Sequence, residues 1–127
     1  MNMIDAVSRN HFLKELYPNG LSEEMLIGYL GFDCDNRFNL NLHSKQRPAK
    51  EVAKWGCWGK NYNVVVICLL GQYVKDIKIS NWECISFAPI TWTRNGDNVT
   101  IHSCSEGWEV SLTFGNIIFQ ECRTYVE

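Results

Sequence analysis

The 127-residue sequence lacks the features that mark several classes of protein. No two of its cysteines are spaced C-x-x-C, and no G-x-G-x-x-G or Gly-Lys-Ser/Thr motif occurs, which argues against a zinc knuckle, a thioredoxin-type redox pair and a phosphate-binding loop. The longest apolar run, Val64 to Leu70, is far shorter than the ~20 residues that cross a bilayer. Charged residues make up only 20% of the chain and its net charge is -2, whereas domains that grip nucleic-acid backbones usually carry an excess of base. We therefore expect neither a membrane nor a nucleic acid as a direct partner.

The composition is that of one folded domain. Hydrophobic residues make up 46% of the chain and aromatic residues 13%, which is enough to build a packed core and excludes a disordered chain. At roughly 100 to 150 residues per domain, residues 1–127 form a single unit. Within it we predict an N-terminal helix and turn over residues 1–20 and an antiparallel β domain over residues 21–127.

The hydrophobic pattern changes from helical to alternating near Gly20. Apolar residues from Ile4 to Leu16 recur at helical spacing and predict one short helix. From Gly20 onward the spacing is mostly two, which is typical of strands with one buried face. Arg37 to His43 alternates without interruption, and the turn residues Asp33 to Asn36 connect it to the preceding strand as a hairpin.

Turn signals divide the second half of the chain into short strands. The run Val64 to Leu70 predicts a strand covered on both faces. Asn95-Gly96 is typical of a two-residue hairpin loop, and Gly115-Asn116 suggests another turn. We therefore predict a mainly β fold, an antiparallel β-sandwich or partly closed barrel of about seven to eight strands with a short N-terminal α-helix. Three tryptophans fall in this strand pattern and are expected in the core: Trp82, Trp92 and Trp108.

The six cysteines are expected to be free thiols. The start of the chain, Met1 to Val7, lacks the basic and apolar regions of a signal peptide, so we expect a cytoplasmic protein in a reducing compartment. Most of the cysteines lie in strand-like segments, where cysteine behaves as a small hydrophobic residue. We therefore predict that they are structural.

No pattern of residues points to catalysis. A nucleophile would need a histidine that is itself oriented by a carboxylate, but His11, His43 and His102 are scattered and are expected on the surface. His102, Cys104 and Cys122 could assemble a metal site only through the fold, since their spacing gives it no support. We predict a protein that is not an enzyme and has neither a metal nor a cofactor.

Two segments are candidates for binding. Asp33 and Asp35 form an acidic turn, which is either simply solvated or contacts a protein partner. The segment Trp55 to Tyr62 interleaves aromatic residues with glycine and lysine. Its aromatic side chains could contact a protein or stack on a sugar, or the loop could fold back so that its tryptophans plug one end of the sheet.

Three features of the C-terminal half stand out together: the segment Asp76-Ile77-Lys78-Ile79-Ser80-Asn81-Trp82, the hairpin at Asn95-Gly96, and the segment Ile117-Ile118-Phe119-Gln120-Glu121-Cys122 with Tyr125. In these features the chain resembles a family of small bacterial immunity proteins from polymorphic-toxin and contact-dependent growth inhibition systems, the immunity protein 50 family. The resemblance extends from about Ser22 to Tyr125. Members often carry a Phe-His-Asp type segment before the first strand, where this chain has Leu21-Ser22-Glu23-Glu24-Met25.

The resemblance implies a cytoplasmic antidote that binds a cognate bacterial toxin domain and occludes its active site. Many such toxins are nucleases with basic clefts, and an inhibitor that presents carboxylates gains association rate. The partner-binding residues we predict are Asp33, Asp35, Trp55, Trp58 and Glu83. The alternative is a β module that binds a small ligand or a carbohydrate through its aromatic loop.

Overall fold

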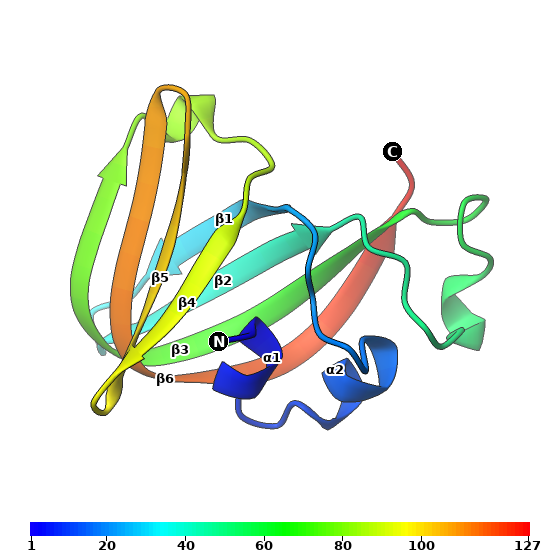
Figure 1. The fold of residues 1–127 in the computed structure, drawn as a ribbon, viewed down its shortest axis with the longest axis horizontal. Helices are drawn as coiled ribbons and strands as arrows, with labels where there is room; N and C mark the ends of the chain where they lie inside the picture. The colour runs from blue at the N-terminus through cyan, green and yellow to red at the C-terminus, as the bar shows by residue number, and fades with distance from the viewer.

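The computed structural model describes residues 1–127 and shows six antiparallel strands in one open sheet, with two short helices. The helices are α1 (Met3–Ala6) and α2 (His11–Leu16), and two 3-10 turns are η1 (Ala53–Trp55) and η2 (Trp82–Cys84). The strands are β1 (Met25–Phe32), β2 (Arg37–Ser44), β3 (Val64–Ser80), β4 (Ile90–Asn95), β5 (Asn98–Ser105) and β6 (Trp108–Tyr125). Their order across the sheet is β1-β2-β3-β6-β5-β4 (Figure 1). The mainly β class is therefore confirmed.

The predicted number of strands differs from the observed one because β3 and β6 each continue past the point where the sequence pattern indicated an end. β3 continues through the polar residues that follow Leu70, and β6 continues through Gly115-Asn116, where we predicted a turn. Asn116 lies opposite Gln72 in the ladder and its side-chain amide donates to the Gln72 Oε1 atom at 3.0 Å. A glycine and an asparagine that signal a turn locally are thus held in a strand by the neighbouring β3.

β3 and β6 bend strongly, so that the sheet wraps around its own core. The ladder between them shifts register at Cys68/Leu69 and at Val74/Asp76, and Tyr73 beside the second shift has a φ of +62°. Such bulges bend a strand and increase its twist. The curvature brings β1 close to the segment before β4, where Met25 and Ala88 exchange two backbone hydrogen bonds of 3.1 Å. The edges of the sheet meet at this single bridge (Figure 1). The predicted β-sandwich or partly closed barrel of about seven to eight strands is not confirmed, because the structure has six strands in one open sheet.

The concave face of the sheet carries one hydrophobic core. The inward residues of β2 and β6 alternate as the sequence pattern predicts, with Phe38 and Phe114 packed at a ring distance of 5.1 Å. Trp92 and Trp108 are buried as predicted, but Trp82 is 37% exposed because η2 lies beyond the end of β3. The burial of each tryptophan therefore depends on whether its segment lies within the sheet, and not on its hydrophobic character alone.

The N-terminal segment covers the core as two helices instead of the one predicted. Ser8 interrupts the helix by pairing with β6: its N–H donates to the Ile117 carbonyl at 2.9 Å, and the Phe119 N–H donates to the Ser8 carbonyl at 3.0 Å. Arg9 then adopts a positive φ of 58°. Because a strand edge is available here, backbone pairing replaces the helical hydrogen bonds that the apolar spacing indicated.

The hairpin between β4 and β5 has the predicted length, with its loop one residue later than expected. Asn95 pairs with Asn98, so the two loop residues are Gly96 and Asp97 rather than Asn95 and Gly96. Of these two only Gly96 has a positive φ, of 65°, which fits a turn with glycine in the first central position.

The cysteines are free, but most are not in the core. Cys68 is buried and Cys122 is half-buried, whereas Cys34, Cys57, Cys84 and Cys104 are exposed. The prediction that most of them act as core residues is wrong, because three of the exposed ones lie in turns or loops and Cys104 lies on the outer face at the end of β5.

The contrast in burial predicts the reactivity of the thiols. Desolvation raises the pKa of the Cys122 thiol to about 12 and raises that of Cys68 above its ordinary value. Because the thiolate is the reactive species, we expect Ellman's reagent at pH 8 to modify the four exposed cysteines quickly and Cys68 and Cys122 slowly. Denaturant should make all six react at once, and a single fast phase of six thiols in the native protein would contradict this burial.

Packing at Gly71 gives a second prediction. A Cβ atom at this position would overlap the ring of Phe38, which lies directly over the Gly71 backbone. Since overpacking a core typically costs ~1–3 kcal/mol, Gly71→Ala should lower the free energy of unfolding by about that amount in urea denaturation. Asn39→Ala, at an exposed residue next to Phe38, should change it by less than about 0.5 kcal/mol. Equal stabilities of the two variants would refute the packing argument.

Candidate protein-binding surface

The second half of β3 is an unpaired strand edge. β2 pairs with β3 only up to Gln72, and the next strand on the other side is β6. From Val74 to Ser80 the outer edge of β3 therefore has no neighbouring strand. Because an open edge exposes unpaired backbone donors and acceptors, it is a place where another chain can pair.

Exposed hydrophobic side chains gather along this edge. Ile77 and Ile79 lie opposite the buried Leu112 and Val110, on the core-facing side of the sheet, yet they are 45% and 39% exposed. They are exposed because β2 has ended and no strand covers them. Three more large hydrophobic residues near the edge are exposed, namely Phe32, Tyr73 and Trp82. We call Phe32, Tyr73, Ile77, Ile79 and Trp82, with the free edge of β3, the β3 surface.

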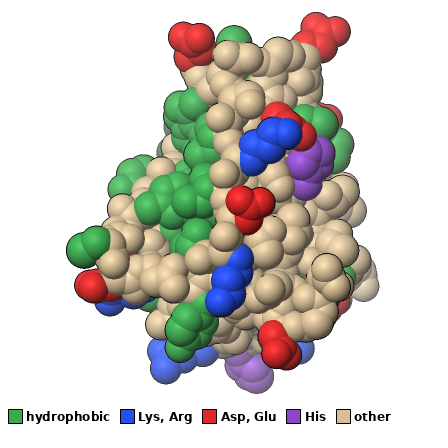
Figure 2. Space-filling model, turned by 90° about the vertical axis from the view of Figure 1, so that its left-hand side faces the viewer, with side chains coloured by type: hydrophobic (Ala, Val, Ile, Leu, Met, Phe, Trp, Pro, Cys, Tyr) green, Lys and Arg blue, Asp and Glu red, His purple; other side chains and the backbone are tan.

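Figure 2 views the molecule from the side where β3 lies and shows hydrophobic side chains gathered beside a column of charged ones. The charged residues on β3 itself are Lys75, Asp76 and Lys78. An apolar centre with a polar rim is the usual anatomy of a protein interface. Single exposed hydrophobic residues need no explanation, but several of them beside one open strand edge favour a binding surface.

Three of the five predicted partner-binding residues lie around the β3 surface. Asp33 and Phe32 line a shallow groove with Val74, Asp76 and Ile77. Asp35 follows in the same turn, and its backbone N–H donates to the Asp33 Oδ1 atom at 2.9 Å. Glu83 lies on η2, which follows the other end of the edge.

The acidic turn is less free to bind a partner than the sequence suggests. Arg37 forms ion pairs with Asp33 at 3.0 Å and with Asp35 at 3.4 Å. Desolvation raises the pKa of Asp33, but hydrogen bonds from the backbone N–H groups of Arg37 and Asp35 and from the Arg37 guanidinium outweigh it, and the pKa lies below its ordinary value. Asp33 therefore shapes the turn, and Asp35, with a side chain 72% exposed, is the more available carboxylate.

The two predicted tryptophans lie elsewhere. Trp55 is only 9% exposed and packs in the core against Phe12 and Tyr62 at ring distances of 5.9 and 5.7 Å. Trp58 is half-buried and packs edge-on against Tyr62 at 5.3 Å. The aromatic loop thus folds back and closes one end of the sheet, so Trp55 is not available as a contact residue.

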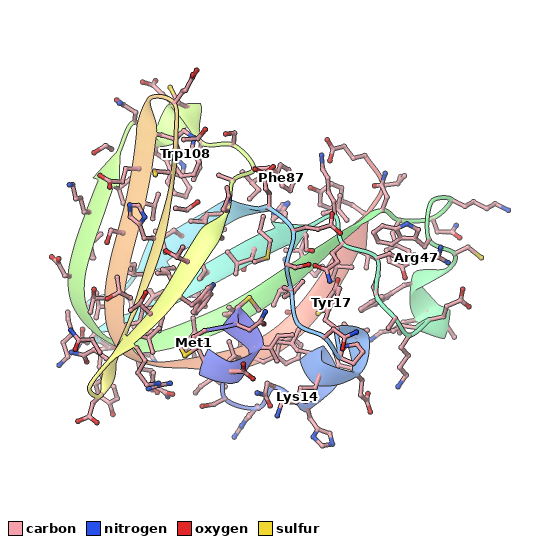
Figure 3. The ribbon with its side chains drawn as sticks, in the orientation of Figure 1. Met1, Lys14, Tyr17, Arg47, Phe87 and Trp108 are labelled. Carbon is pink, nitrogen blue, oxygen red and sulfur yellow. The ribbon has the colours of Figure 1, made fainter.

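The loop that carries these tryptophans is basic. Five lysines or arginines and one acid, Glu51, lie between residues 44 and 63, so this segment contributes +4 and the remaining residues -6 to the net charge of -2. The bases are Lys45, Arg47, Lys50, Lys54 and Lys60. Arg47 marks this loop at one end of the molecule, whereas the free edge of β3 lies at the other (Figures 1 and 3). The basic loop and the free edge of β3 therefore lie at opposite ends of the molecule, and two of the loop lysines, Lys45 and Lys50, are paired with Glu127 and Glu15.

A network of charged residues crosses the outer face behind the β3 surface. Glu109 on β6 accepts a hydrogen bond from the His102 Nε2 atom on β5 at 2.9 Å. It also forms an ion pair with the Lys78 Nζ atom on β3 at 3.2 Å. No three histidine, cysteine or acidic side chains are grouped to hold a metal ion, so His102, Cys104 and Cys122 do not assemble the site considered from sequence. His43, at the other end of the sheet, bonds through Nδ1 to the Tyr125 hydroxyl at 2.8 Å.

Comparisons with protein-family models, with curated proteins and with solved structures found no match to this chain. No helix in the structure combines the length and hydrophobicity needed to cross a membrane.

The network on the outer face gives a pH-dependent prediction. The hydrogen bonds from His102 and Lys78 hold the pKa of Glu109 below its ordinary value of 4.5. These contacts therefore stabilise the fold fully above about pH 4.5 and lose their effect as the pH falls through the lower native pKa. Carboxyl NMR titration should show Lys78→Ala raising the pKa of Glu109, while Lys75→Ala on the same strand leaves it unchanged. If neither substitution changes the pKa of Glu109, the contact between Lys78 and Glu109 is excluded.

Proposed function

We propose that this protein is an immunity protein that neutralises a cognate bacterial toxin domain by binding it through the β3 surface and occluding its active site. The observation that carries the proposal is the exposed apolar edge of β3, bordered by unpaired carboxylates at the end of the molecule away from the basic loop. Asp76 and Glu83 form no ion pair within the chain. The resemblance of the β3 and β6 sequences to immunity proteins supports the same function.

The charged and the hydrophobic residues of this surface contribute to binding in different ways. Carboxylates that have no partner of their own attract a basic cleft from a distance and raise the association rate. The hydrophobic residues then lose water on contact, which holds the complex together. We infer that the toxin is basic, as a nuclease cleft is, and that the contact residues are Asp35, Asp76, Ile77, Ile79 and Glu83, with Trp82 beside them.

The proposal is tested with the neighbouring gene. We expect it to encode a large exported protein with a variable toxic domain, and co-expression of this chain with that domain should restore growth. Survival lost despite normal expression of both proteins would reject the immunity function. Ile77→Ser combined with Ile79→Ser should abolish protection while the far-UV circular dichroism spectrum stays native.

Charge reversal tests the electrostatic part separately. Glu83→Lys should slow association with the toxic domain by roughly 3- to 10-fold at low ionic strength, with a smaller effect in high salt. Glu51→Lys makes the same change in charge in the basic loop and serves as the matched control. Stopped-flow or surface plasmon resonance measurements in which both variants slow association equally would show that net charge alone, and not the β3 surface, steers the partner.

A further inference from the structure

The free edge of β3 alternates in a way that makes it complementary to itself. Asp76 and Lys78 lie opposite Thr113 and Ser111, on the outer face of the sheet, while Ile77 and Ile79 lie on the core-facing side. Opposite charges two residues apart on one face therefore flank an isoleucine on the other. A strand with this pattern can pair with an antiparallel copy of itself so that Asp76 of each copy lies opposite Lys78 of the other.

One register matches the outward charges and the central isoleucines at once. When two antiparallel copies of the edge are centred on Ile77, each Asp76 stands opposite Lys78 of the second copy, and the two Ile77 side chains stand opposite each other. Cross-strand pairs of opposite charge and of β-branched residues both stabilise a sheet. The two charge pairs are related by the two-fold axis of such a dimer, which is the usual symmetry of homodimers.

Neighbouring registers are unfavourable. A centre on Lys78 places two ammonium groups directly opposite each other, and like charges in that position destabilise a sheet. A shift by one residue places the outward residues of one copy against the inward residues of the other. The register centred on Ile77 therefore avoids both of these conflicts.

Both charged groups are available for this pairing. Asp76 forms no ion pair within the chain. Lys78 contacts Glu109, but its side chain is 66% exposed, and an ammonium group has three N–H donors. Asn81, with a φ of 52°, ends the extended segment just after the edge.

We propose that two copies of this protein pair edge to edge through β3, antiparallel and centred on Ile77, so that their two sheets become one. The pairing covers Ile77 and Ile79 in both copies, so a paired copy cannot use these isoleucines to bind the toxin domain of the proposed function until the dimer dissociates. It also places η2 of each copy, with Trp82 and Glu83, beside the β1–β2 turn of the other, which carries Asp35. The dimer rests on the edge itself and stands whether or not the partner of the protein is a toxin.

Charge variants test this register. Wild-type protein should show twice the 14.7 kDa monomer mass in sedimentation equilibrium as its concentration rises. Asp76→Lys alone and Lys78→Asp alone each place like charges opposite each other and should give monomers. The double variant Asp76→Lys/Lys78→Asp exchanges the pair and should dimerise again, whereas Asp97→Lys, in the β4–β5 loop, should dimerise like the wild type.

Mixing the two single variants provides the sharpest test. One copy then has lysine at both positions and the other aspartate at both, so a heterodimer should form although neither variant dimerises alone. Native circular dichroism spectra of the single variants separate loss of pairing from loss of folding. A wild-type protein that stays monomeric at all soluble concentrations overturns the proposal. Dimerisation that is the same in the wild type and in all of these charge variants overturns it as well.

The experiments distinguish an error in the proposed pairing from an error in the proposed function. If the double charge-exchange variant dimerises but no longer protects against the toxin, the pairing is correct and the charges also contact the toxin. If the protein is monomeric yet protects, the edge pairing is wrong and the proposed function survives.

Discussion

The pairing of β3 with β6 is the interaction on which the rest of the structure depends. The ladder runs from Val64 opposite Tyr125 to Ser80 opposite Glu109, and it is much longer than any other contact between elements. One half of it carries β2 and β1, and the other half carries β5 and β4. The two halves of the protein therefore share the same two strands, and the bulges within these strands set the curvature that encloses the core.

The same arrangement leaves the β3 surface exposed. Because β2 and β5 attach to different halves of the ladder, each long strand is paired on both sides for only part of its length. On β6 the exposed edge is partly covered by Ser8 and the N-terminal helices, while on β3 nothing covers the corresponding stretch. A charged strand edge with a bulge is a common protection against unwanted pairing, but Ile77 and Ile79 leave this one partly hydrophobic.

Much of the fold was predictable from local pattern. The alternation in β2, the acidic turn before it and the hairpin length near Gly96 follow from residue types that act within a few positions. The errors arose where distant segments decide. Gly115-Asn116 is a turn signal that β3 overrides, and the helical spacing of the N-terminal residues is overridden by the strand edge that binds Ser8.

The site was only partly predictable for the same reason. The chemistry of Asp35 and Glu83 was visible in the sequence, but their position at the two ends of one edge depends on where β2 stops pairing. The isoleucines of β3 look like ordinary core residues in any pattern of alternation, since their exposure results from a strand that is missing beside them. Trp55 is the opposite case: the sequence suggested an exposed contact residue, but the loop that carries it folds inward and packs Trp55 against Tyr62.

The long ladder also governs how the chain acquires its structure during synthesis. β3 emerges before its partner, and the residues between Ser80 and Tyr125 must be made before the ladder is complete. At ~5–20 residues per second this takes on the order of several seconds, during which the apolar strand Val64 to Leu70 has only β2 beside it. Folding is thus dominated by contacts between distant residues, which form slowly, and the nascent chain exposes its most hydrophobic strand to chaperones or to other chains until β6 arrives.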